Sequence, residues 1–285
     1  MANEDKVSSL GQFIERVRDI REAWSPLEHK ELWFRGEDKL HDTALRPKLY
    51  RPSKDGLMKP VDALVRIEMD LYNAFQDCGL QLCNETIQQE NWYWDWYFLM
   101  QHHGAPTRLL DWSDGSLIAL HFALRHKLKT NTEDVVVYLL NPYSMMEQLE
   151  KLPEYAQVKH NWEVYAKKHT EFSQDEWECS YLPPDDEEDL KELPVPEIPC
   201  VLHLPHITRR VAAQRSRFVV LGTDATWLYD AFQKCDYLMR AIIIEASATY
   251  RMKQELRECG ITESVIFPDL DGLGRELDQL WEDKK

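Results

Sequence analysis

The segment Tyr97–Leu124 concentrates polar side chains between two apolar helical patterns, in the sequence YFLMQHHGAPTRLLDWSDGSLIALHFAL. Gly104 can end the first helix, and Pro106 forces Ala105 into an extended conformation, so these residues have structural duties. The polar side chains that remain for chemistry are those of His102, His103, Thr107, Arg108 and Asp111. Side chains this close to a helix end can line one pocket with the N-terminus of the next helix, which favours an anion.

Structural roles for these same residues have to be weighed beside the chemical ones. Arg108 and Asp111 could form a buried ion pair that braces the turn, and we favour this role for Asp111 because breaking such a pair is costly. Each histidine alone is more often a structural residue than a catalytic one.

A second candidate arginine lies in the segment WFRG, residues 33–36. Gly36 permits a tight turn or the close approach of a ligand, and Arg35 offers a planar guanidinium that suits a phosphate or a carboxylate. The alternative is an arginine in a structural ion pair, and three residues alone favour that alternative.

A local basic run stands out in the segment ITRRVAAQRSRFVVLG, residues 207–222. It contains Gln214 and the arginines Arg209, Arg210, Arg215 and Arg217. An acidic protein with a cationic pocket can attract a small anionic ligand without attracting bulk nucleic acid. These arginines could equally pair with the acidic residues 171–192, and both alternatives stay open.

Motifs of common enzyme classes are missing from the sequence. No Walker loop, Rossmann glycine set, nucleophile elbow or HExxH motif occurs, so standard nucleotide-binding and hydrolase folds are not expected. His203 and His206 are three residues apart but have no cysteine or acidic partner at zinc-like spacing, so we expect no metal.

Composition narrows the class of protein. The 285 residues carry a formal net charge of −16, which argues against a broad nucleic-acid-binding surface. The six cysteines form no CxxC pair, so reduced thiols and a cytoplasmic location fit better than disulfides. The acidic, amphipathic start MANEDKVSSLGQFIERV is unlike a signal peptide, and no apolar run is long enough to cross a bilayer, so no membrane partner is expected.

Hydrophobic periodicity predicts which elements must position the candidate residues. Helices are expected after Ser9 and over 60–76, 88–103 and 117–128, the last capped by Asp114 or Ser116, and another after a cap at Ser247. Strands are expected over 31–36, 134–141, 200–204, 217–222 and 240–246, and the segment 264–281 reads as a strand, a turn and a helix. Helices dominate the first half and short strands the second, which indicates an α+β fold.

Residues 143–199 differ from the rest and form a polar, acidic insertion within what we expect to be a single domain, residues 1–285. Residues 171–192 hold many carboxylates, so a mobile, solvated loop is the expected structure. The functional alternative is that Phe172, Trp177 and Tyr181 dock on a basic partner or fold over RRVAAQRSR as a lid.

Four segments of the chain, in order, resemble the signature segments of the FRG domain: WFRG, QHHGAPTRLLDWSDGSLIALHFA, AAQRSRF and GITESVIFPDLDGL. The resemblance spans roughly residues 30–275 and implies a fold similar to that of ADP-ribosyltransferases. In such a fold the helical N-terminal half packs on a small, mostly antiparallel split sheet. The implied function is that of an NAD-dependent ADP-ribosyltransferase or NAD glycohydrolase of the toxin or phage-defence type, acting on an unknown protein or nucleic-acid acceptor.

The resemblance also implies roles for individual residues. Arg35, helped by Arg108, would clamp the NAD diphosphate, and Gly36, His102 and Thr107 would complete the cofactor site. NAD would be the substrate, and its nicotinamide–ribose bond would break through an oxocarbenium-like transition state.

His103 and Gln214 are the catalytic candidates. His103 would orient a ribose hydroxyl or act as a base, and Gln214 would hydrogen-bond the ribose or the acceptor. The chain departs from the family where Ser216 replaces a usual glycine, and an ADP-ribosyltransferase would normally place a catalytic glutamate in a Q/E-x-E triplet where this chain reads QRS. The identity of the catalytic acid is therefore open, and the alternative function is a non-catalytic nucleotide-binding or protein-interaction module.

Overall fold

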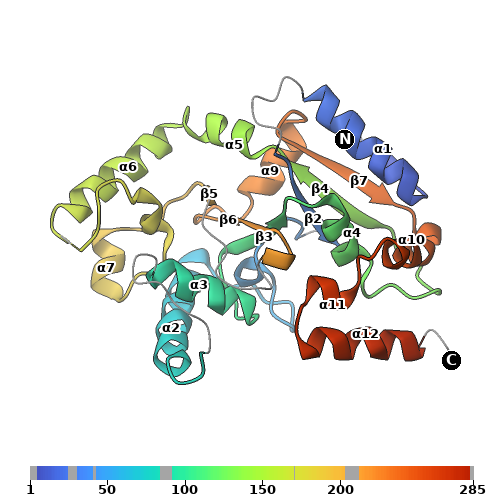
Figure 1. The fold of residues 1–285 in the computed structure, drawn as a ribbon. Coiled ribbons are helices and arrows are strands. Elements are labelled where there is room, and N and C mark those ends of the chain that lie inside the picture. Colours follow the sequence, from blue (N-terminus) through green and yellow to red (C-terminus); the bar gives the residue numbers. More distant parts are fainter. Residues whose placement is uncertain are drawn as a thin grey trace.

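The apolar strand patterns pair into a seven-stranded sheet at the centre of the computed structural model (Figure 1). The structure describes residues 5–24, 31–40, 43–83, 92–169, 171–202 and 212–282. The strand order is β1-β7-β4-β2-β3-β6-β5. The strands are β1 (Asp5–Val7), β2 (Trp33–Glu37), β3 (Leu109–Ser113), β4 (Val135–Leu140), β5 (Cys200–Leu202), β6 (Ser216–Val220) and β7 (Met239–Ile244).

The sheet is mostly antiparallel. Within the described residues only β1 and β7 run parallel, and the other neighbouring strands are antiparallel. Strand β4 is buried along its whole length, as its β-branched sequence predicts. Together with the surrounding helices, this sheet confirms the α+β fold expected from the sequence.

The sheet opens between β2 and β3. These two strands are in register at one residue pair, Phe34 opposite Ser113. By contrast, β2 pairs with β4 over five residues and β3 pairs with β6 over five. The sheet therefore consists of two halves, β1-β7-β4-β2 and β3-β6-β5, that are joined over a short stretch.

Strand alternation divides the core between the two faces of the sheet. Val135, Val137 and Leu139 of β4 pack with helices α1 (Leu10–Ala23), α4 (Ser116–Leu124) and α10 (Ala246–Glu258). The alternate residues of β4 face the second core, which includes side chains of α2 (Val61–Gly79), α3 (Trp92–His102) and α9 (Trp227–Lys234). Figure 1 shows α2 and α3 on the side of the molecule away from α1 and α10.

Helix ends agree with the sequence in part. The Ser9 side chain accepts a hydrogen bond from Gln12 N at 3.2 Å, and Gly104 follows α3 with a φ of +81°, as expected. The expected caps of α4 and α10 are wrong, because these helices begin after Gly115 and Glu245.

Residues 143–199 contain several helices, and those within residues 171–192 contradict the loop expected there. Apart from residue 170, the segment holds α5 (Pro142–Leu149), α6 (Pro153–Ala166), the 3₁₀ helix η3 (Trp177–Tyr181) and α7 (Glu187–Glu192). The Phe172 ring lies 5.4 Å from Trp162, and the Trp177 ring lies 5.2 Å from Tyr155. Tyr181 is fully buried in the core of α3 and the sheet. These aromatic side chains therefore anchor the acidic segment to α6 and to the central core.

The chain closes with α11 (Glu263–Ile266) and α12 (Leu270–Glu282), so the strand expected at the start of residues 264–281 is a short helix instead. A 3₁₀ helix, η1 (Lys48–Tyr50), follows β2. No helix among the described residues is both long and apolar enough to span a membrane.

Candidate functional site

A cavity of about 380 Å³ lies where the sheet opens between β2 and β3. Residues 34–37 of β2 and 111–113 of β3 all line it. Successive side chains of a strand point to opposite faces, so a cavity that touches consecutive residues of both strands must lie along their edges. Its volume is in the range of small-molecule sites, which is roughly 300–1,000 Å³.

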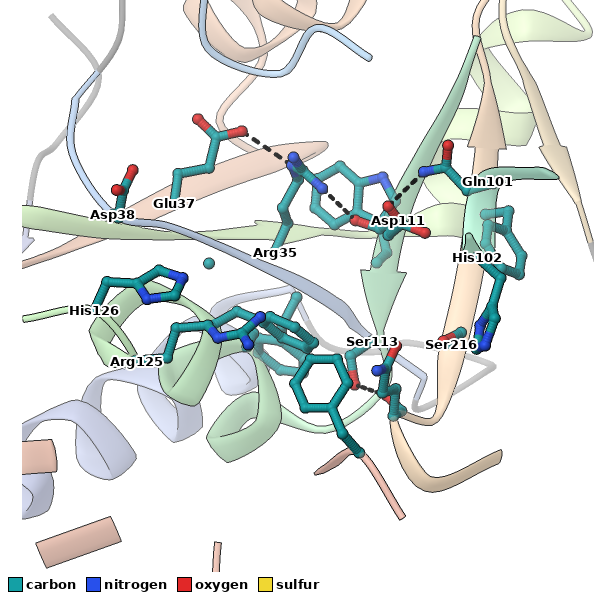
Figure 2. Close-up of a pocket in the computed structure, with 18 of the residues that line it drawn as sticks. Arg35, Glu37, Asp38, Gln101, His102, Asp111, Ser113, Arg125, His126 and Ser216 are labelled. Atoms are coloured by element: carbon teal, nitrogen blue, oxygen red, sulfur yellow. Dashed lines mark hydrogen bonds and ion pairs between the residues drawn. The ribbon is translucent and has the colours of Figure 1, made fainter. Parts of the chain in front are cut away.

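Arg35 bridges the opening between the two strands, and Figure 2 shows its guanidinium between Glu37 and Asp111. Arg35 Nε donates to Glu37 Oε1 at 3.0 Å, and Arg35 Nη1 donates to the Asp111 carbonyl oxygen at 2.8 Å. Arg51 Nη2 lies 3.8 Å from the same Glu37 oxygen. Burial and the nearby charge of Arg35 lower the pKa of Arg51. Two guanidinium groups thus share one carboxylate at this end of the cavity.

Gly36 lines the cavity, but the packing of α4 gives the physical reason for a glycine. A Cβ built on Gly36 would lie 1.9 Å from the Ala119 carbonyl oxygen of α4. The glycine therefore allows α4 to lie against the backbone of β2. This close approach brings residues of α4 to the wall of the cavity.

The α3 side of the cavity carries His102, Gln101 and Phe98. Gln101 Nε2 donates to Asp111 Oδ2 at 2.7 Å, so the expected pairing of Asp111 with Arg108 is wrong. Asp111 is exposed and borders the cavity. Its strand neighbours Leu110 and Trp112 point to the opposite face of the sheet, into the core.

The β6 side contributes Gln214, Ser216 and Phe218. Ser113 Oγ donates to the Gln214 carbonyl oxygen at 2.8 Å, and Gln214 Nε2 donates to the Ile266 carbonyl oxygen at 3.4 Å. The Phe218 ring packs 4.6 Å from the Phe98 ring. The structure therefore brings Arg35, Gly36, His102 and Gln214 to one cavity.

The remaining wall comes from the end of α4 and from Phe267. The Arg125 guanidinium lies 4.5 Å from the centre of the Phe267 ring, and Arg125 Nη2 donates to Glu263 Oε1 at 2.5 Å. His126 follows, and burial together with the charge of Arg125 lowers its pKa.

Arg108, Thr107 and His103 do not reach the cavity, contrary to expectation. Arg108 is fully buried, and its Nε donates to Glu68 Oε2 at 2.5 Å on the far side of β3. Thr107 is fully buried and donates to Gln101 Oε1 at 2.5 Å.

His103 lines a separate, apolar cavity between α2 and α3, with its ring 6.4 Å from Phe75. Consecutive helix residues differ by about 100° in direction, so His102 faces the site while His103 faces α2. His103 and Arg35 therefore border different cavities.

Two arginines of the basic run form ion pairs near the ends of β2 and β3. Arg217 Nε lies 2.7 Å from Glu31 Oε1, and Arg217 Nη2 lies 2.7 Å from Asp114 Oδ2, which Arg215 also contacts through the other carboxylate oxygen. Arg215 and Arg217 thus brace β6 against β2 and β3. Arg209, Arg210, His203 and His206 lie outside the described residues.

Two buried polar atoms of cavity-lining residues, Glu37 Oε2 and Arg125 Nε, have no hydrogen-bond partner within the described part of the chain. Buried polar atoms are nearly always hydrogen-bonded in folded proteins. A ligand bound in the cavity could supply these missing partners.

Comparison with known proteins identifies one domain family. Residues 30–132, from just before β2 to just before β4, match the FRG domain. The match includes Arg35, Gly36, His102 and Asp111 and stops short of Gln214. No curated protein and no solved structure matches the chain.

Sequence reasoning missed Glu37, Asp38, Arg51, Arg125 and His126, which all line the cavity. Glu37 carried a usable signal, because it follows Arg35 by two residues and so shares its face of the strand. Arg51 and Arg125 carried none, because only the packing of η1 and α4 brings them to β2.

Proposed function

We propose that this FRG protein binds NAD in the cavity between β2 and β3 and breaks the bond between nicotinamide and ribose. The ADP-ribose unit then passes to a protein or nucleic-acid acceptor, or to water. This is the activity that the FRG resemblance implies, and it would suit a toxin or a phage-defence protein.

The observation that supports the proposal best is the presence of unpartnered polar atoms at a cavity in the size range of small-molecule sites. The site also combines the chemical groups that NAD requires. Arg35 and Arg51 offer guanidinium donors for the diphosphate, and Arg51 replaces the buried Arg108 in this role. The rings of Phe122 and Phe267 offer an apolar wall for nicotinamide.

The chemistry follows from the charges around the cavity. When the C–N bond breaks, its electron pair leaves with nicotinamide, and positive charge develops on the ribose. Carboxylates fixed nearby stabilise that charge, and Glu37, Asp38 and Asp111 line the cavity. An acceptor hydroxyl or a water then bonds to the ribosyl carbon and releases its proton, which the imidazole of His102 or of His126, both of which line the cavity, can accept.

Nicotinamide release is the test of the proposal. Purified protein incubated with NAD, with and without a cell lysate as acceptor, should release nicotinamide, which chromatography quantifies. Arg35→Ala should lower the rate by about 100-fold or more, because it removes a charged donor at the reacting substrate. Arg66→Ala is the matched control, since Arg66 is half-exposed on α2 and pairs with Glu187 away from the cavity. Equal rates for wild type and Arg35→Ala would contradict the proposal.

A non-catalytic nucleotide-binding module is the second candidate. It is favoured by the segment Gln214–Ser216, which offers no carboxylate and in which Gln214 hydrogen-bonds to backbone and side-chain groups of the protein. Binding of NAD without any release of nicotinamide, in the presence of the lysate, would support this module and exclude the enzyme.

A further inference from the structure

The carboxylate of Glu37 is buried beside the cavity, and only one of its two oxygens accepts a hydrogen bond. Its side chain is 5% exposed. One oxygen, Oε1, accepts the hydrogen bond from Arg35 Nε and lies near Arg51, whereas Oε2 has no hydrogen-bond partner among the described residues. A buried carboxylate oxygen without a partner is costly, so the site favours a ligand that brings a donor beyond those of the described residues.

The position of Glu37 limits which donor can bind there. The two guanidinium groups hold Oε1, so the carboxylate cannot turn Oε2 toward another part of the chain without breaking both contacts. Arg35 and Arg51 already supply positive charge to this carboxylate, so Oε2 does not require a cation. A neutral donor fits these charges.

A hydroxyl group suits this environment better than an amide N–H. A hydroxyl donates one hydrogen bond and accepts others, whereas an N–H only donates. Arg35 Nη2 makes no hydrogen bond within the described chain and is held close to Glu37 by the Nε contact. A ligand hydroxyl can therefore donate to Glu37 Oε2 and accept from a neighbouring guanidinium.

We propose that Glu37 is a substrate-binding residue that recognises a ribose hydroxyl of the ligand through Oε2, while Oε1 holds Arg35 and Arg51 in place. The inference deepens the proposed function and rests on it for the choice of an NAD-like ligand. According to this proposal, the site binds a ribosyl compound and binds an analogue without the recognised hydroxyl more weakly.

The experiment measures binding of ADP-ribose and of four analogues that each lack one ribose hydroxyl, by calorimetry. For the wild type, removal of one particular hydroxyl should weaken binding by about tenfold or more, because a site built to bond a hydroxyl rejects the analogue without it. In Glu37→Gln that discrimination should fall below about threefold, since the amide no longer offers a carboxylate acceptor between the arginines. Glu187→Gln, which removes a carboxylate from the exposed pair with Arg66, should discriminate like the wild type.

Glu37→Asp is a second variant, in case Glu37→Gln fails to fold, because it keeps the negative charge. Its shorter side chain should lose part of the discrimination between the analogues. Equal binding of all analogues by the wild type would overturn the inference, and so would unchanged discrimination in Glu37→Gln or a failure of ADP-ribose to bind. Nicotinamide release measured in parallel separates the two proposals. Release with unchanged discrimination in Glu37→Gln contradicts only the role of Glu37, whereas hydroxyl-specific binding without release contradicts only the catalytic activity.

Discussion

Arg35 and Arg108 carry the same guanidinium group into two different environments. Arg35 borders the cavity with a side chain that is 15% exposed, and it spans the gap between β2 and β3. Arg108 has no exposed surface, and it donates to Glu68 and to the carbonyl oxygens of Tyr181 and Leu221. Arg35 is therefore available to a ligand, whereas Arg108 ties β3 to α2 and η3.

Removal of Arg108 should destabilise the fold strongly. Arg108→Ala leaves the buried Glu68 carboxylate without its cation, which costs about 3–5 kcal/mol of the free energy of unfolding. Urea denaturation followed by circular dichroism measures the loss. The control Arg66→Ala breaks an exposed ion pair and should cost under about 1 kcal/mol. A loss of similar size in both variants would show that Arg108 does not stabilise the packing of β3 against α2 and η3.

Gly36→Ala should also destabilise the protein, through packing. The added methyl would overlap the Ala119 carbonyl oxygen, so α4 and β2 must separate, at a cost of about 3 kcal/mol. Gly11→Ala is the matched control, because nothing lies within 4 Å of a Cβ on Gly11 in α1, and the change should stabilise the helix by about 0.5–1 kcal/mol. Urea denaturation of both variants tests the pair, and equal effects would refute the close approach of α4.

Elements that depend on distant partners are the ones that sequence patterns could not predict. Leu109–Ser113 follows Pro106 closely and reads as a turn, yet it forms β3 because it pairs with β6, more than a hundred residues later in the chain. Val265 and Ile266 favour a strand by propensity, yet they lie in α11. Strongly patterned elements such as β4, α2 and α3 were predictable because their own residues decide their periodicity.

The candidate site likewise contains residues that sequence patterns predict and residues that only tertiary packing places there. Arg35 and His102 could be predicted because each lies in a short segment with a clear polar signature. Thr107 and Arg108 could not be told apart from them, since a shift of one residue along a strand moves a side chain to the other face of the sheet. Arg51 and Arg125 reach the cavity only through tertiary packing.

At the scale of elements, Glu263 ties α11 to α4 and α12. Its fully buried carboxylate accepts hydrogen bonds from Arg125 at 2.5 Å and Arg275 at 2.9 Å, and His121 Nε2 lies 3.2 Å away. Burial opposes ionisation, but the hydrogen bonds from His121 and Arg275 outweigh it and lower the pKa of Glu263 from 4.5 to about 2. Because Arg125 and Phe267 line the cavity, this carboxylate also supports the site.

A dependence of stability on acid pH follows from that lowered pKa. A carboxyl whose pKa is depressed by folding contributes stability above its unfolded pKa and loses it as the pH falls through the folded value. The difference in unfolding free energy between wild type and Glu263→Gln should therefore be constant above about pH 5 and shrink between about pH 4.5 and 2. Urea denaturation across this range measures it, and a difference that does not change with pH would contradict the assignment.

At the scale of the whole molecule, the acidic segment belongs to the structure that carries the sheet. Tyr181 is fully buried beside β5, and its carbonyl oxygen accepts from Arg108 Nη2 at 2.6 Å. Asn73 of α2 donates to the carbonyl oxygen of Asp185, and Arg66 of α2 pairs with Glu187. The carboxylates of the segment are distributed over helix ends and surface pairs, so its high charge does not prevent it from packing.

Replacement of residues 173–190 by a short glycine–serine linker should consequently destabilise the protein instead of releasing an active form. The deletion removes the Tyr181 ring from the core and a hydrogen-bond acceptor from buried Arg108, and either loss alone costs about 2 kcal/mol or more. Thermal unfolding followed by circular dichroism should show a melting temperature lower by 10 °C or more, roughly, for these combined losses. Substitution of the exposed acidic residues alone, Asp175→Asn with Glu188→Gln, should leave the melting temperature within about 2 °C, because neither side chain is buried. An unchanged melting temperature together with faster nicotinamide release from the deletion variant would instead identify the segment as an autoinhibitory lid.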